Sequence, residues 1–106
     1  LDARKKWIAS TLHAKGYLKI DEGAENALKK GKSLLAAGVK SVEGSFMKGD
    51  QIKIISKNHK ELAIGLSSFS SEEINKIKGH QSNKIEELIG YKTKTEVVHK
   101  DDMVEI

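Results

Sequence analysis

The amino-acid sequence predicts a small α+β domain in which short helices flank a curved, partly closed sheet of mixed or antiparallel strands. Several short runs alternate apolar and polar side chains, which is typical of strands with one buried face. Between these runs lie segments that begin at a helix-capping residue and end at a glycine. The chain has 106 residues, which is enough for one hydrophobic core. Strands and helices that follow one another in this mixed order favour the α+β class.

The composition excludes several classes of function. Without cysteine there is no disulfide, thiolate nucleophile or cysteine-type zinc site, which fits a cytoplasmic location. No apolar run is long enough to span a membrane, so we expect no membrane partner. The net charge of +4 comes almost entirely from lysine, since Arg4 is the only arginine. A basic domain suggests nucleic-acid binding, whereas the scarcity of arginine favours an ordinary solvated lysine surface.

The N-terminal residues predict a helix over Asp2–Leu12, with Ala3, Trp7 and Ile8 on one side. Two roles remain open for this helix. It could be a linker that packs on a preceding domain, or it could dock on the core of this domain. We assign residues 1–12 to the linker and residues 13–106 to the domain itself.

A strand over Tyr17–Ile20 precedes the best-defined helix of the chain. Asp21 can cap this helix, because its carboxylate can accept from the free N–H groups of the first turn. Gly31 stands where a left-handed residue would end it. The apolar side of the helix is spaced i, i+3, i+4 and consists of Ala24, Ala27 and Leu28.

The middle of the chain predicts strands joined by tight turns. A short apolar pair, Leu34–Leu35, and a turn at Ala37–Gly38 lead into a strand over Val39–Val42, and Phe46 anchors the next loop. The following two strands form an antiparallel hairpin around an Asn58–His59 turn. They cover Gln51–Ser56, with Ile52 and Ile54 on one face, and Glu61–Ser68, with Leu62, Ile64 and Leu66 on one face.

Two short helices follow the hairpin. Ser70 and Glu73 form a capping box that opens the first helix, which Gly79 ends. We expect Ser82 to cap the second helix and Gly90 to end it. The inward-facing residues are Ile74 and Ile77 in the first helix, and Ile85, Leu88 and Ile89 in the second.

The last strand covers Thr95–His99, and Lys100–Ile106 is a polar tail that extends it. His99 lies two and three residues before Asp101 and Asp102, which could orient an imidazole. Because no nucleophile accompanies this group, we favour a surface role for the histidine.

Nothing else in the sequence has the spacing of a catalytic site. Gly31-Lys32-Ser33 is similar to the end of a phosphate-binding loop, but the earlier glycine is missing and a helix, not a strand, comes before it. We therefore expect no catalytic residue, no cofactor-binding residue and no metal ligand in this chain. The histidines are scattered, at His13, His59, His80 and His99.

Several lysines gather along the helix, loop and strand between residues 21 and 42. Such a stripe could follow a phosphate backbone, with Gly31 and Gly38 allowing close approach. The alternative is that these lysines only solvate the surface and complement the helix dipole. The stripe consists of Lys29, Lys30, Lys32 and Lys40.

The order strand, helix, G-x-S-L-L-x-x-G-V, strand resembles the PUA domain, and the match is closer to the C-terminal PUA domains of bacterial glutamate 5-kinases. A PUA-like pseudo-barrel is therefore the expected form of the α+β fold. The resemblance covers nearly the whole chain. It rests on ARKKWIA (3–9), DEGA (21–24), GKSLLAAGVKSVEGSF (31–46), IGLSSFSSEEI (64–74), IKGHQS (77–82), IGY (89–91) and VVHKDDMV (97–104).

The resemblance implies a role that composition does not reveal. The parent enzyme would phosphorylate the γ-carboxylate of L-glutamate with ATP and Mg²⁺, the first step of proline biosynthesis, and would form homo-oligomers. Its catalytic residues would lie in a preceding amino-acid-kinase domain, so this chain would be a non-catalytic regulatory or assembly appendage. The alternative is an RNA-binding module, as in RNA-modifying relatives. Carried over by position, its surface would comprise Ala27, Lys30, Gly31, Lys32, Ser33, Leu34, Lys40, His99 and Lys100.

Overall fold

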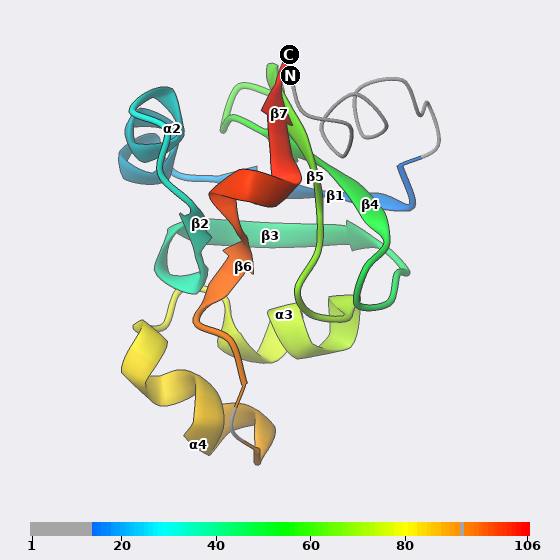
Figure 1. The fold of residues 1–106 in the computed structure, drawn as a ribbon, viewed down its shortest axis with the longest axis vertical. Helices are drawn as coiled ribbons and strands as arrows, with labels where there is room; N and C mark the ends of the chain where they lie inside the picture. The colour runs from blue at the N-terminus through cyan, green and yellow to red at the C-terminus, as the bar shows by residue number, and fades with distance from the viewer. Residues whose placement is uncertain (1–13, 92) are drawn as a thin grey trace.

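A five-stranded mixed sheet, in the order β3-β1-β4-β5-β7, and a two-stranded ladder, β2-β6, make up the strands of this computed structural model (Figure 1). The structure describes residues 14–91 and 93–106. The helix predicted over Asp2–Leu12, with Trp7, lies outside the described residues, so the division at residue 12 stays a prediction. The strands are β1 Gly16–Ile20, β2 Leu34–Leu35, β3 Val39–Gly44, β4 Gln51–Ile55, β5 Glu61–Leu66, β6 Glu96–Val98 and β7 Met103–Glu105.

Short helices surround the sheet, as predicted. The α-helices are α2 Glu22–Lys29, α3 Ser71–Ile77 and α4 Ile85–Ile89. Three 3₁₀ turns connect them with the strands, at η1 Ala36–Gly38, η2 Ser82–Lys84 and η3 Lys100–Asp102. Strands β1 and β4 pair in parallel, and the other neighbours in the sheet pair antiparallel. The α+β class is therefore confirmed, with an open sheet whose edges are β3 and β7.

The hydrophobic core lies between one face of the sheet and the helices. Leu18 and Ile20 of β1 and Ile52 and Ile54 of β4 are fully buried on this inner face. The helices add Leu28 from α2, Ile74 and Ile77 from α3 and Ile85 from α4. Phe46, the predicted loop anchor, is also in the core.

Most of the predicted caps are present. The Asp21 carboxylate accepts from the Ala24 N–H at 2.7 Å and caps α2. Ser70 and Glu73 form the predicted capping box of α3. Gly90 ends α4 in the left-handed conformation, with φ of 89°.

The predicted cap at Ser82 is wrong. Ser82 is the first residue of the 3₁₀ turn η2, which has no side-chain cap, and α4 begins only at Ile85. A serine signals that a helical turn can start nearby, but the residue type does not distinguish a 3₁₀ turn from an α-helix.

The C-terminal tail also differs from the prediction. The residues after His99 form η3 and then β7, which pairs with β5 in the large sheet, whereas β6 pairs with β2. The tail is therefore a separate strand and not an extension of β6. The His99 imidazole caps η3 between the two strands, because its Nδ1 accepts from the Asp101 N–H at 3.0 Å.

Strand β5 presents its small residues to the core. Leu62, Ile64 and Leu66 share a face as predicted, but they are only half-buried, whereas Ala63 and Gly65 are buried. A Cβ on Gly65 would lie 2.6 Å from Val98 Cγ1 and 2.9 Å from the Asp102 carbonyl oxygen. The chain between β6 and β7 therefore passes too close to β5 for a larger side chain at this position.

Candidate functional site

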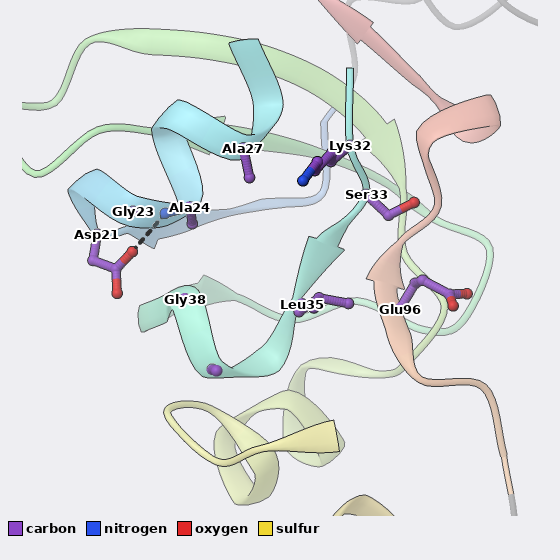
Figure 2. A pocket seen from close by; sticks show the side chains of 10 residues that line it. Asp21, Gly23, Ala24, Ala27, Lys32, Ser33, Leu35, Gly38 and Glu96 are labelled. Atoms are coloured by element: carbon purple, nitrogen blue, oxygen red, sulfur yellow. Dashed lines mark hydrogen bonds between the residues drawn. The ribbon is translucent and has the colours of Figure 1, made fainter. Parts of the chain in front are cut away.

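An open hollow of about 500 Å³ lies between α2, the loop that follows it, η1 and the start of β6 (Figure 2). Much of its lining is apolar, because Ala24 and Ala27 of α2 face Leu35 across it. Leu35 is 45% exposed, which is high for a leucine next to a core. The charged side chains that line the hollow are Asp21, Lys32 and Glu96.

One wall of the hollow is fixed by close packing between α2 and η1. A Cβ on Gly38 would collide with the Cβ of Ala24, so the turn fits against the helix only because residue 38 is glycine. The Asp21 N–H also donates to the Gly38 carbonyl at 2.9 Å. The sequence suggested that Gly38 lets a phosphate backbone come close. In the structure, helix α2 is the element that packs closely against Gly38.

The loop after α2 is held by a Schellman motif. The Gly31 N–H donates to the Leu28 carbonyl at 2.9 Å, and the Lys32 N–H donates to the Ala27 carbonyl at 3.0 Å. Gly31 has φ of 77°, the left-handed conformation that this motif needs and that the sequence predicted. The motif turns the chain so that Lys32 lines the hollow.

The same loop contacts the C-terminal part of the chain. The Ser33 hydroxyl oxygen accepts from the Lys100 N–H at 2.8 Å, across 67 positions of sequence. Gly31 and Lys100 line a second hollow of about 510 Å³ next to β7. The sequence-predicted neighbours, the glycine loop and the segment at His99–Lys100, therefore do lie side by side.

The residues proposed for RNA binding are thus only partly brought together. Ala27, Lys32 and Ser33 line the first hollow, and Gly31 and Lys100 line the second. The side chain of Leu34 is buried, at 1% exposure, and is closed to a ligand. Lys30 is exposed after the last turn of α2, and Lys40 is exposed on β3.

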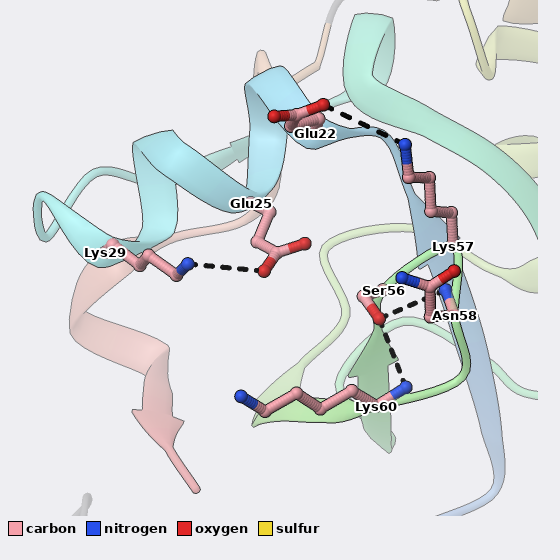
Figure 3. Close-up of polar contacts among 7 residues, drawn as sticks. All are labelled: Glu22, Glu25, Lys29, Ser56, Lys57, Asn58 and Lys60. Carbon is pink, nitrogen blue, oxygen red and sulfur yellow. Dashed lines mark hydrogen bonds and ion pairs between the residues drawn. The ribbon is translucent and has the colours of Figure 1, made fainter.

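Lys29, the remaining lysine of the predicted stripe, faces another part of the surface. Lys29 Nζ lies 3.4 Å from a carboxylate oxygen of Glu25, on the side of α2 near the β4–β5 turn (Figure 3). On the same side, Lys57 Nζ of that turn lies 3.8 Å from Glu22. Pairs as exposed as these contribute little stability, but they reduce the positive charge available to a phosphate backbone.

The chemistry of the first hollow is that of a contact surface. Two carboxylates and one lysine surround an apolar lining, and the Asp21 carboxylate is occupied by the cap of α2. Within the part of the chain that the structure describes, no group of three or more His, Cys, Asp or Glu side chains could hold a metal ion.

The site predicted from the sequence included only Ala27, Lys32 and Ser33 of this lining, and Leu35 and Glu96 are among the residues that it missed. They are partners in the β2–β6 ladder, whose register shifts between Leu34 and Leu35. The alternation of a strand indicates that one of two adjacent leucines points outward. It does not reveal which strand pairs with this one, so Glu96 could not be placed beside it from the sequence.

Comparison with known proteins identifies the fold. A family model described as the PUA domain matches residues 16–89. The chain belongs to the PUA domain family. This PUA domain is 63% identical to a glutamate 5-kinase from Pelagibacter ubique, over all of its 106 residues and 29% of the length of that relative. The chain therefore spans less than a third of a curated relative that it matches.

Solved structures show the same fold. The crystal structure of a PUA domain from Aeropyrum pernix K1, a tartrate complex, matches with a TM-score of 0.60 and 27% identity, over 80% of this chain and 41% of that one. A chain of the archaeal box H/ACA sRNP Nop10–Cbf5 complex matches with a TM-score of 0.56 and 20% identity, over 79% of this PUA domain and 24% of that chain. In the described residues of the PUA domain, no helix is both long and apolar enough to cross a membrane.

Proposed function

We propose that this chain is the PUA domain of a glutamate 5-kinase and that it acts there as a non-catalytic appendage which regulates or assembles the enzyme. The observation that carries the proposal is the 63% identity with a glutamate 5-kinase over the whole chain. The parent enzyme transfers the γ-phosphoryl group of ATP, with Mg²⁺, to the γ-carboxylate of L-glutamate. It works in the cytoplasm as a homo-oligomer.

The chemistry of the hollow supports a role without catalysis. Phosphoryl transfer needs clustered cations and oxygen ligands for Mg²⁺ around the phosphates. The first hollow offers one lysine, Lys32, among apolar side chains, and its Asp21 carboxylate already caps α2. A half-exposed leucine in an open hollow suits contact with another protein surface better than contact with a nucleotide.

The proposal is tested by deleting residues 13–106 from the full-length kinase. We expect the truncated enzyme to phosphorylate glutamate still, because the kinase domain holds the reacting groups. The resemblance to glutamate 5-kinases also implies feedback inhibition by proline. This inhibition, the dependence of the enzyme on Mg²⁺ or its oligomeric state should change. Steady-state kinetics and light scattering measure these properties, and a truncated enzyme that matches the intact one in all of them would contradict the appendage role.

RNA binding is the second candidate function, and one contact favours it. The hydrogen bond from the Lys100 N–H to Ser33 places two basic segments next to each other, with Lys32 on one and Lys100 on the other. The PUA fold also occurs in a chain of a ribonucleoprotein complex. The carboxylates of Asp21 and Glu96 at the adjacent hollow oppose this role, since they repel a phosphate backbone.

Titration of the chain with structured RNA at low and moderate salt separates the two candidates. If the lysines contact phosphates, Lys30→Ala and Lys32→Ala should each weaken binding and reduce the salt slope by about one. Lys57→Ala is the control, because it removes the same charge near Glu22 on another part of the surface. Equal effects of all three changes would indicate that only net charge matters and would remove the support for an RNA site.

A further inference from the structure

A short connection joins the two sheets of the molecule. It consists of His99 and the three residues of η3, and it runs from β6 in the two-stranded ladder to β7 in the five-stranded sheet (Figure 1). Val98 before the connection is fully buried, and Met103 after it is 8% exposed. Any rearrangement of η3 therefore takes place between two ends that are anchored in the core.

A histidine side chain caps this connection. His99 is the N-cap of η3, and its Nδ1 accepts from the Asp101 N–H at 3.0 Å. Asparagine and aspartate usually make this kind of turn, in which a side chain accepts from the backbone N–H two residues later. Because the backbone N–H is the donor, Nδ1 carries no proton, and the proton of the neutral ring lies on Nε2.

The same ring nitrogen has a second partner, which suits the opposite protonation state. The Oδ2 atom of Asp101 lies 3.6 Å from His99 Nδ1. An ionised carboxylate can only accept, so it makes no hydrogen bond with an unprotonated nitrogen. A protonated Nδ1 can no longer accept from the backbone, but it can donate to this carboxylate as a cation. Asp101 therefore offers its N–H to the neutral ring and its carboxylate to the charged ring.

Contacts at both ends of η3 confine this exchange of partners to its middle residue. At the first residue, the Lys100 N–H donates to the Ser33 hydroxyl oxygen at 2.8 Å. At the last residue, the carbonyl oxygen of Asp102 lies so close to β5 that a Cβ on Gly65 would come within 2.9 Å of it. The turn is therefore held on both sides while Asp101 changes its partner.

Charges of both signs surround the imidazole. In η3 and the segments next to it, the charged residues are Lys100, Asp101 and Asp102 of η3, Glu105 of β7 and Lys32 of the loop after α2. Strand β2, which pairs with β6, has no charged residue. Strand β5 has one, Glu61, and its carboxylate pairs with Lys53 at 2.9 Å.

We propose that His99 is a pH-sensitive switch in the connection between the two sheets. The neutral imidazole holds the Asp101 N–H and fixes the middle of η3. The charged imidazole releases that N–H and pairs with the Asp101 carboxylate. The proposal does not depend on the function proposed above, because every group in it belongs to this chain.

The switch changes the lining of the second hollow. Lys100 and Asp101 both line this hollow, with Gly31 opposite them. When the Asp101 carboxylate pairs with the imidazolium, it no longer balances the charge of Lys100. Protonation of His99 therefore makes this part of the hollow more positive, and it leaves a backbone N–H of a lining residue without its cap.

A titration of the 106-residue chain by nuclear magnetic resonance between pH 8 and pH 5 covers the range in which histidines ordinarily change charge. We expect the proton of the neutral His99 ring on Nε2, and an Asp101 amide signal that moves with the same midpoint as the ring. Relative to His99→Asn, exchange of this amide with water should become about twofold to tenfold faster at the acid end, the effect of one net hydrogen bond. A neutral ring protonated on Nδ1, or an Asp101 amide that does not follow the ring, would overturn the proposal.

His99→Asn is the matched control, because an asparagine oxygen accepts from the same N–H at every pH in this range. Its Asp101 amide should lose the midpoint, and a midpoint that persists would assign the change to another group and contradict the switch. Ser33→Ala removes the acceptor of the Lys100 N–H, so it should loosen η3 equally at both ends of the pH range. Acid loosening of the same size at every amide of η3 would indicate general fraying, which also contradicts a switch at Asp101.

Discussion

At the scale of single residues, caps and turns were predictable because their chemistry is local. Asp21 and Ser70 each lie three residues before the N–H group that they cap, so the sequence contains both partners. Ser70 also has a reciprocal partner in Glu73, which strengthens the signal. Ser82 has no such partner, and its cap was the one that failed. A cap prediction is therefore firmer where two side chains agree than where one residue type stands alone.

Replacing the cap of α2 tests how much one such residue contributes. Asp21→Ala removes the acceptor for the Ala24 N–H, and we expect a loss of about 1 kcal/mol in the free energy of unfolding. Asp21→Asn keeps a capping oxygen and removes only the charge, so it should lose less. Urea denaturation of the two variants measures both values. An equal loss in both would show that the charge near the helix N-terminus matters and that the hydrogen bond does not.

Gly38 fixes the wall of the first hollow through its lack of a side chain. In Gly38→Ala the new Cβ would meet the Cβ of Ala24, which cannot rotate away, so α2 must shift. We expect a loss of about 1–3 kcal/mol in the free energy of unfolding, the usual cost of overpacking. Gly23→Ala is the control, because its Cβ would meet only an Asp21 oxygen at 3.5 Å and alanine favours the helix. Thermal unfolding should show a lower midpoint for Gly38→Ala only, and a normal midpoint would contradict the close packing of α2 on η1.

At the scale of elements, the period of a strand was predictable but the face that it buries was not. The alternation in β5 correctly grouped Leu62, Ile64 and Leu66, and size alone would assign these residues to the core. The structure instead buries Ala63 and Gly65. The reason is tertiary, since the segment between β6 and β7 passes directly over Gly65. Nothing within β5 encodes that neighbour, which lies more than thirty positions later in the chain.

Of two substitutions on opposite faces of β5, the one at the smaller residue should therefore cause the larger loss of stability, although residue size alone suggests the reverse. Ala63 is fully buried, so Ala63→Leu adds volume to a packed core, and we expect a loss of about 1–3 kcal/mol in the free energy of unfolding. Ile64→Val on the opposite face of β5 removes one methylene from a half-buried side chain and should cost less than about 1 kcal/mol. Chemical denaturation of both variants compares them. A larger loss for Ile64→Val would mean that the face of β5 with Ile64 contributes more to stability than the face with Ala63.

At the scale of the whole molecule, the fold class was predictable and the composition of the site was not. The order of elements and the quoted motifs led to the α+β PUA fold, which the structure and the family match confirm. The hollow, however, is assembled from α2, η1, β2 and β6, and its Glu96 comes from a strand some sixty residues after Leu35. The sequence predicted one stripe of four lysines, but only one of them, Lys32, lines the hollow; the stripe was Lys29, Lys30, Lys32 and Lys40. Residues close in sequence, such as the lysines, do not share this site, whereas Leu35 and Glu96, which are distant in sequence, lie next to each other in it.

The topology and the composition together predict how the isolated chain refolds. Pairing of β5 with β7 joins Ala63 to Glu105, so the native sheet needs distant contacts, and we expect refolding in milliseconds to seconds. The chain has no proline, so it should lack the slow phase of roughly 10–100 s that proline isomerisation produces. Stopped-flow fluorescence or circular dichroism after dilution from denaturant measures both.

Ala36→Pro supplies the matched control for that experiment. Ala36 is the first residue of η1, where proline is favoured, and Leu35 before it is extended at φ −105° and ψ 154°, as a residue before proline must be. The Ala36 carbonyl, which accepts from the Gly79 N–H at 2.7 Å, is retained in proline. We expect the variant to fold and to gain a slow phase of roughly 10–30% amplitude, the usual cis fraction in unfolded chains. A slow phase already present in the unchanged chain would show that another step, such as closing the sheet through β7, limits folding.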